Sequence, residues 1–161
     1  MEKIVRPFID TCKNVFQELF GAAISESRPY LIESGAIADG DISAIIGLTG
    51  DTRGAVVITM KKDLAIKITG MLTGTEHKDL DDDVIDAVGE ILSIITGNVK
   101  KSLEDDLHLI LSLPTVVQGQ NHVIRWPGIR RQYMRFPFKI FLNSTFSLSV
   151  AIESVDKKDA T

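Results

Sequence analysis

Apolar and polar residues recur with helical periodicity over the longest patterned stretch of the chain, residues 79–104. At about 100° per residue, its polar and small side chains fall within an arc of about 100°. They are Asp79, Asp82, Asp83, Asp86, Glu90, Ser93, Gly97, Lys100, Lys101 and Glu104. Apolar residues occupy most of the remaining circumference. The pattern therefore predicts a long helix that is buried on most of its surface and exposes one narrow polar strip.

Two further stretches have helical spacing. Apolar residues recur through residues 3–20, which predicts an amphipathic helix that packs on a sheet, with Gly21 as its C-terminal cap. Pro7 falls near the first turn of this helix, where a missing N–H is tolerated. A shorter helix is predicted over residues 64–72, after Asp63 as its N-cap and before Gly74.

Strands account for most of the rest of the chain. Runs of β-branched and apolar residues, separated by turn residues, predict them. They cover residues 30–33, 42–49, 54–60, 109–113, 116–118, 122–126, 132–142 and 145–153, and the second and third form a hairpin across a turn at 50–54. These elements predict one α+β domain over residues 1–153, with an antiparallel-rich sheet of about six strands and the helices layered on it. A flexible tail is predicted over residues 154–161.

The strand predicted over residues 132–142 has two different faces. One is apolar, and the other carries Arg131, Tyr133, Arg135 and Lys139. Basic residues with an interleaved aromatic are typical of a track for single-stranded nucleic acid. A strand with one face in water gives the same pattern, however, and the net charge of −4 argues against nucleic acid as a partner. We therefore expect no nucleic-acid partner.

The overall composition is that of a globular protein with a substantial core. Of the 161 residues, 44% are apolar and 25% are charged. No run of 18 apolar residues occurs, and the first ten residues mix charges into their apolar positions. We therefore expect neither a membrane span nor a secretory signal, and hence a cytoplasmic location.

Little in the sequence suggests a metal or a cofactor. The three histidines, His77, His108 and His122, are far apart and lack the spacing of metal ligands. Cys12 lies on an apolar helical face, which is typical of a small core residue rather than a nucleophile. The acidic residues 81–83 are accounted for by the positive end of the helix that they precede. We expect no cofactor and no metal of the protein's own.

The middle of the polar strip holds the candidate functional residues Asp86, Glu90, Ser93 and Gly97. A glycine in the exposed interior of a helix costs about 1 kcal/mol relative to alanine, and it is favoured where something approaches the backbone closely. Two interpretations stay open on these residues alone. The strip is an ordinary solvated face that tolerates a glycine, or it is a docking surface with one long carboxylate, Glu90, at its centre.

The same residues resemble the signature helix of a known family. The order Asp86, Glu90 and Ser93, followed by residues 94–97 (IITG), is similar to that of the CheC/CheX/FliY chemotaxis phosphatases, in which Asp or Ser, then Glu, then Asn occur at this spacing. The single copy of the helix, the chain length and residues 113–119 (LPTVVQG) resemble the CheX branch in particular. The resemblance covers most of residues 1–153. One departure concerns the chemistry, because Ser93 stands where the family has Asn.

The resemblance implies a function for the strip. The helix would dock on a phosphorylated receiver domain of the CheY type, with Glu90 at the receiver's lysine and the residue at position 93 orienting the attacking water. Asp86 and Gly97 would contact the partner. The receiver would carry the Mg²⁺ and the acyl phosphate, so that catalysis consists of positioning and electrostatics. The resemblance also implies a homodimer that joins sheets across subunits, with the late strands supplying the edge.

Ser93 weakens the expected activity, because a hydroxyl is one bond shorter than an amide and has a single donor. Asn98 does not replace the missing amide, since it lies about 80° round the helix from Glu90, toward the side expected to be buried. The main hypothesis is therefore a receiver phosphatase with reduced activity. The alternative is a non-catalytic adaptor that binds a receiver or another signalling partner through the same strip. A structural dimerisation module is a more distant option.

Overall fold

The computed structural model describes residues 2–33, 35–125 and 133–154. Along the chain it contains α1 (Glu2–Phe20), β1 (Ser25–Glu26), β2 (Tyr30–Ile32), β3 (Ile42–Gly50), β4 (Thr52–Met60), α2 (Lys62–Thr73), α3 (Asp82–Leu103), β5 (Leu109–Leu111), β6 (Thr115–Gln118), β7 (Tyr133–Ile140) and β8 (Ser144–Ser154). The predicted α+β class is confirmed. The predicted tail, apart from Ser154, lies outside the described residues, and the prediction of one domain over residues 1–153 stays a prediction.

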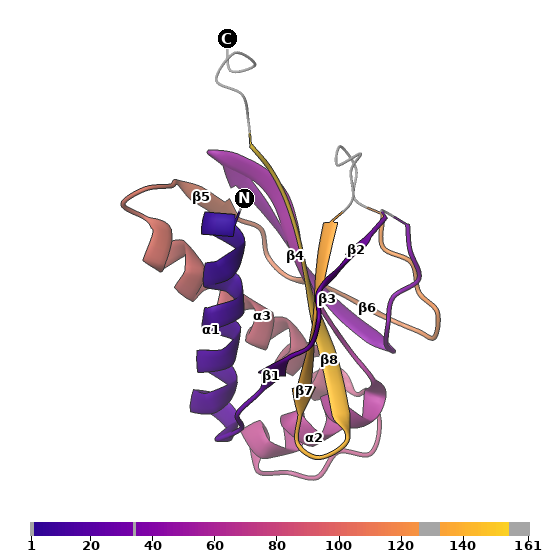
Figure 1. Ribbon diagram of the computed structural model, residues 1–161. Helices are drawn as coiled ribbons and strands as arrows, with labels where there is room; N and C mark the ends of the chain where they lie inside the picture. Colours follow the sequence, from indigo (N-terminus) through magenta and orange to yellow (C-terminus); the bar gives the residue numbers. More distant parts are fainter. Residues whose placement is uncertain (1, 34, 126–132, 155–161) are drawn as a thin grey trace.

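The strands form one sheet in which all described pairings are antiparallel. The order is β1-β7-β8-β4-β3-β5, with β2 also paired to β7 and β6 also paired to β3. Within the described residues the sheet has eight strands, against the expected number of about six. One of them, the two-residue β1, is too short to show alternation in the sequence. The three helices lie on one side of this sheet (Figure 1).

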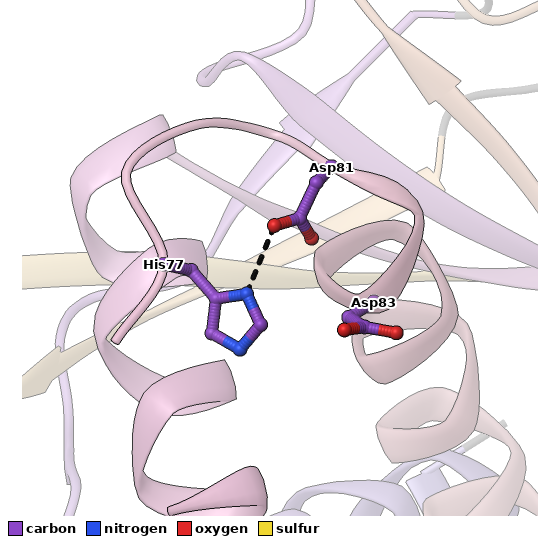
Figure 2. Close-up of side chains that lie close together, drawn as sticks. All are labelled: His77, Asp81 and Asp83. Carbon is purple, nitrogen blue, oxygen red and sulfur yellow. Dashed lines mark hydrogen bonds and ion pairs between the residues drawn. The ribbon is translucent and has the colours of Figure 1, made fainter. Parts of the chain in front are cut away.

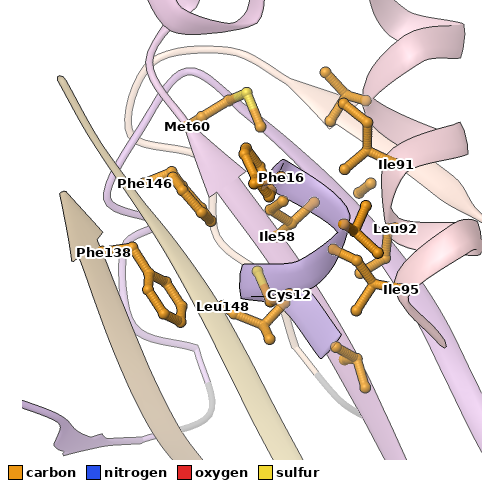
Figure 3. Packing of buried hydrophobic residues seen from close by; sticks show 14 of the residues in the cluster. Cys12, Phe16, Ile58, Met60, Ile91, Leu92, Ile95, Phe138, Phe146 and Leu148 are labelled. Atoms are coloured by element: carbon orange, nitrogen blue, oxygen red, sulfur yellow. The ribbon is translucent and has the colours of Figure 1, made fainter. Parts of the chain in front are cut away.

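The main core fills the space between the helices and the sheet (Figure 3). Phe16 of α1 stacks on Phe146 of β8 with 4.6 Å between the ring centroids, and Phe146 also stacks on Phe138 of β7. Cys12 is completely buried in this cluster, and burial raises the pKa of its thiol. The prediction that Cys12 is a core residue is confirmed.

The predicted hairpin is present, but its turn is tighter than expected. Strands β3 and β4 are joined at Asp51, next to Gly50 with a φ of 104°. Gly54, predicted as part of the turn, lies inside β4 opposite Ile152 of β8. A side chain there would collide with the carbonyl oxygen of Ala151, so this glycine serves close strand packing and not a turn.

The other side of the sheet is not the wet face that the sequence suggested. A second, smaller cluster covers it, made of Ile32, Ala55, Val57, Tyr133 and Ala151. Arg135, predicted to be in water, is only 8% exposed, and its Nη1 donates to the hydroxyl of Tyr30 at 3.3 Å. Lys139 is exposed as predicted. The prediction failed because the segment before β3 folds over this face, which alternation within β7 cannot reveal; Arg131 and Gln132 lie outside the described residues.

The strand predicted over residues 122–126 is absent from the described part, which ends there at Arg125. Only an isolated bridge between Val123 and Ile37 forms. Side-chain contacts of His122 hold this segment instead. Nδ1 of its ring lies 2.7 Å from the carbonyl oxygen of Gly119, and Nε2 lies 2.7 Å from Oγ of Ser43. Trp126 lies outside the described residues.

None of the helices in the described ranges is long and apolar enough to cross a membrane. The predicted strands β2, β5, β6, β7 and β8 and the three predicted helices are confirmed, with ends that differ by a few residues. The predicted N-cap of α2 was wrong, because this helix begins at Lys62 and Asp63 lies in its first turn.

Candidate functional site

The candidate strip lies on α3, whose start is defined by a capping residue. Asp81 accepts a hydrogen bond from the backbone N–H of Val84 through Oδ1 at 3.0 Å. Acidic residues in the first turn and Lys100 and Lys101 in the last turn complement the helix dipole. The buried side of the helix packs into the main core. It consists of Val84, Val88, Gly89, Ile91, Leu92, Ile95, Thr96 and Val99.

The opposite side of α3 carries Asp86 and Glu90, and both are exposed. Within the described ranges, neither carboxylate has a hydrogen-bond or ion-pair partner in its own subunit. The helical pattern therefore placed Glu90 correctly, since its side chain is exposed and no described residue pairs with its charge. A carboxylate in this state is available to a cationic group on another protein.

Ser93 lies one turn beyond Glu90 and is half-buried. Its backbone carbonyl accepts a bond from Oγ1 of Thr96 at 3.3 Å. No partner within the described chain holds its own hydroxyl, which leaves that hydroxyl free to bind water or a partner group. Thr96, on the other flank, is buried, and its hydroxyl also donates to the carbonyl of Leu92 at 3.0 Å.

The two glycines of α3 differ in their surroundings. A methyl group added at Gly97 would meet nothing within 4 Å, so the backbone there is open to approach from outside. A methyl group added at Gly89 would lie 3.4 Å from Cγ2 of Val116 and 3.6 Å from Cβ of Pro114. Gly89 is therefore the residue that lets the start of β6 pack closely against α3.

Sequence reasoning missed the contact between Gly89 and Pro114. The periodicity of α3 places Gly89 on its apolar side, where a glycine does not by itself indicate a close contact. A usable signal was present, however, in the pairing of a glycine on the buried face of a helix with a Leu-Pro pair shortly after the helix ends. The contact matters because it places the connection between β5 and β6 against α3 at the residue that directly precedes Glu90.

The expected burial of Asn98 was wrong, because its side chain is exposed. The flank that carries it is only partly covered by the rest of the fold, and Ile94, one turn earlier on that flank, is half-buried. Asn98 nevertheless lies on a different flank from Ser93. Eight residues also separate it from Glu90, which is about 12 Å along the helix axis. It does not join the group formed by Glu90 and Ser93.

A comparison with protein families identifies the group to which this arrangement belongs. The sequence model of the family described as chemotaxis phosphatase CheX matches residues 42–139, which include α3 and the contact with Pro114. The chain belongs to the CheX family.

Individual relatives agree with this assignment. The CheX family member of Thermotoga maritima, described as CheY-P phosphatase CheX, is 24% identical over 154 residues, which are 94% of this chain and 97% of that protein. The crystal structure of the chemotaxis protein CheX from Vibrio vulnificus is 30% identical, has a TM-score of 0.81 and matches 94% of this chain and 99% of its own. The CheX–CheY–BeF3–Mg complex from Borrelia burgdorferi contains a chain with 24% identity, a TM-score of 0.77 and matched shares of 92% and 97%.

A second cluster of polar residues lies at the start of α3, where Figure 2 shows His77, Asp81 and Asp83 close together. One ligand atom from each lies within 4.8 Å of the others, a spacing that a metal ion would fit. The hydrogen bonds account for the arrangement in another way. Nδ1 of His77 contacts Oδ2 of Asp81 at 2.9 Å and Nε2 contacts Oγ1 of Thr73 at 3.0 Å, so both ring nitrogens are occupied. The cluster ties the end of α2 to the start of α3.

We expect this connection to weaken in acid. The hydrogen bond with His77, and secondly the bond from the backbone N–H of Val84, hold the pKa of Asp81 below its usual value of about 3.9. A lowered pKa means that the native state gains stability from the ionised form above that value, and loses it as the pH falls through the lower, folded pKa. Asp81→Asn keeps a capping oxygen but cannot titrate. Its urea midpoint is expected to lie below that of the wild type at pH 6, and this gap should narrow as the pH falls through the folded pKa of Asp81.

The control for this measurement is Asp82→Asn, which changes an exposed neighbour without a side-chain bond within the described ranges. Its difference from the wild type is expected to be smaller at pH 6. A gap between Asp81→Asn and the wild type that stays the same at pH 6 and pH 2 would contradict the role given to the ionised carboxylate.

Proposed function

We propose that this CheX family protein docks through the strip of α3 on a phosphorylated receiver domain of the CheY type and promotes hydrolysis of its aspartyl phosphate. The observation that supports the proposal best is Glu90, which is exposed and free of partners from the described chain at the centre of the strip. A relative of similar length is described as a CheY-P phosphatase, and another is found in a complex with CheY.

The proposed chemistry requires little from this chain beyond positioning. Glu90 pairs with a lysine of the receiver, and the bond strengthens as docking removes water from it. The hydroxyl of Ser93 binds the attacking water. Oxygen of that water forms a bond to phosphorus while the bond between phosphorus and the aspartyl oxygen breaks, which releases inorganic phosphate and the free carboxylate. The receiver supplies Mg²⁺, and the protein supplies no cofactor or metal. This proposal places the protein in the cytoplasm, together with its receiver.

The experiment that tests the proposal measures phosphate release from a CheY-type receiver phosphorylated with acetyl phosphate in Mg²⁺, with and without a tenth of an equivalent of this protein. Each receiver domain of the source organism is assayed in turn. Release that is faster than the receiver's own rate, over several turnovers, is the expected result. If no receiver loses phosphate faster, the protein is not a receiver phosphatase.

A non-catalytic adaptor is the second candidate, and Ser93 is the observation that favours it. Its short side chain leaves the strip and Glu90 intact for binding while reducing the groups that orient water. Binding to a receiver that is activated with beryllofluoride and Mg²⁺, without any increase in phosphate release, would identify the protein as an adaptor.

The homodimer expected by resemblance stays a prediction. Tyr30 is 43% exposed and Leu31 is 56% exposed on β2, which pairs within the described sheet only with β7. These apolar side chains at an edge of the sheet are compatible with a second subunit there.

Gly97→Ala is expected to separate stability from function. Alanine in the interior of a helix is favoured over glycine by about 1 kcal/mol, and the open surroundings of Gly97 provide room for the methyl group. The free energy of unfolding in urea should therefore rise by about that amount. If the receiver approaches the backbone at Gly97, the same methyl group should raise the KM for the phosphorylated receiver.

Asn98→Ala is the matched control for this substitution. It also introduces alanine into an exposed position of the same helix, but on the neighbouring flank. It should stabilise the fold without a change in KM. An unchanged KM for Gly97→Ala would show that the partner does not contact this part of the strip.

A further inference from the structure

An isolated leucine projects from the surface beside the strip. Leu113 follows β5, and 87% of its surface is exposed. Only Leu142, on the turn between β7 and β8, is more exposed among the large apolar residues in the described ranges, at 96%. A single exposed leucine needs no explanation by itself. Leu113 differs from other exposed apolar residues in two respects. Its backbone is held by contacts on both sides, and it lies next to the polar strip of α3.

The backbone on both sides of Leu113 is fixed. Before it, the hydroxyl of Ser112 accepts a bond from the N–H of Gly47 at 2.8 Å and donates to the carbonyl of Leu113 at 3.0 Å. The N–H of Ser112 also donates to the carbonyl of Gly47 at 3.0 Å. After it, Pro114 packs against Gly89 of α3. An apolar side chain on a fixed backbone loses little conformational freedom when it binds, which favours its use as an anchor.

The position of Leu113 relative to the strip follows from the same packing. Gly89, the contact of Pro114, directly precedes Glu90 in α3. At about 100° per residue, Ser93 lies only about 40° round the helix from Gly89, and Asp86 about 60°. Leu113 therefore stands at the flank of the strip that carries Ser93 and Asp86, next to the proposed reaction and not on a remote surface.

We propose that Leu113 is an apolar anchor that packs against the receiver beside its phosphorylated site. This inference rests on the proposed function and names the partner surface that it requires, which is an apolar patch next to the receiver's lysine. Such a contact excludes water from the edge of the complex and lowers the local dielectric, which strengthens the pair between Glu90 and the lysine. The anchor contributes to binding and does not touch the reacting atoms.

The test compares Leu113→Ser with Leu142→Ser. Both replace a highly exposed leucine, but the two leucines lie in different parts of the sheet. Residue 112, next to Leu113, is bonded to β3, whereas Leu142 lies on the turn between β7 and β8. In the sheet, β4 separates β3 from these two strands. Loss of a buried leucine side chain corresponds to a ten-fold or greater loss of affinity. Leu113→Ser is therefore expected to raise the KM for the phosphorylated receiver by about ten-fold. It should raise the Kd for the receiver activated with beryllofluoride and Mg²⁺ by about the same factor. The kcat should stay unchanged, and Leu142→Ser should match the wild type in all three constants.

The outcomes separate this inference from the proposed function. Wild-type protein that binds the activated receiver, with Leu113→Ser binding within two-fold of it, would overturn the anchor and leave the proposed function standing. A fall in kcat at unchanged KM would overturn the anchor as well, because it would give Leu113 a role in the chemistry. Failure of the wild type to bind any activated receiver would overturn both. Because the side chain is exposed, the thermal midpoints of both variants should equal that of the wild type, which confirms that folding is not the cause of any loss.

Discussion

Glu90→Ala is expected to lower kcat/KM for the phosphorylated receiver by at least about 30-fold, with no loss of stability. Truncating one member of a desolvated, hydrogen-bonded charge pair at an interface costs about 2–5 kcal/mol, and each 1.4 kcal/mol is about a ten-fold effect. The carboxylate of Glu90 has no partner in the described part of its own subunit, so its removal breaks nothing in the fold. The measurement is phosphate release under conditions where the receiver concentration is below KM, together with the thermal midpoint.

Two further variants test whether the effect of Glu90→Ala comes from the loss of this particular charge. Glu90→Gln keeps the length and removes the charge, so it should fall between the wild type and alanine. Asp86→Asn removes an exposed charge one turn earlier and should reduce kcat/KM by less than three-fold, because a side chain shorter by one bond reaches the partner less well. A Glu90→Ala protein that keeps its kcat/KM within three-fold of the wild type would remove the central residue of the proposed site.

The outward direction of Glu90 could be predicted because one helix carries all the required information. The repeat of apolar residues in α3 is long and regular, and the angle between two residues of a helix depends only on their separation in sequence. The sequence of β8 also carries a local pattern, since Phe146, Leu148 and Val150 alternate with polar residues, and all three apolar side chains are buried.

The features that escaped prediction depend on contacts between segments that are distant in sequence. Arg135 looked solvated because the segment that covers it precedes β3, far from β7 in the chain. Gly89 looked like an ordinary buried position until Pro114, 25 residues later in the chain, was placed against it. Asn98 is exposed because the rest of the fold covers its flank of α3 only in part, which periodicity alone does not show. The burial of each of these residues depends on tertiary packing, which a local sequence pattern does not reveal.

Ser93→Asn is expected to raise kcat for dephosphorylation by about ten-fold or more, with a KM close to that of the wild type. A well-oriented reactant accounts for many kcal/mol of an enzymatic barrier, and a small misplacement costs up to about 100-fold in rate. An asparagine amide reaches one bond further than the serine hydroxyl and offers an acceptor and two donors, so it can hold the water in line with phosphorus from two sides. The substitution breaks no hydrogen bond of the hydroxyl within the described chain, and the position is only half-buried.

Ser93→Ala and Ser102→Asn complete the comparison and decide between the two candidate functions. Ser102 is an exposed serine near the end of the same helix, so Ser102→Asn introduces the same residue and the same helix propensity away from the site and should leave kcat unchanged.

A rise in kcat that is confined to position 93 would mean that the strip already holds the geometry of a phosphatase and that the serine reduces its rate. If Ser93→Ala and the wild type both turn over as fast as Ser93→Asn, the side chain at position 93 does not orient the water, and Glu90 together with the receiver's own groups must supply the whole effect. If none of the three releases phosphate but all bind the activated receiver equally, the strip is a binding surface and the protein is an adaptor.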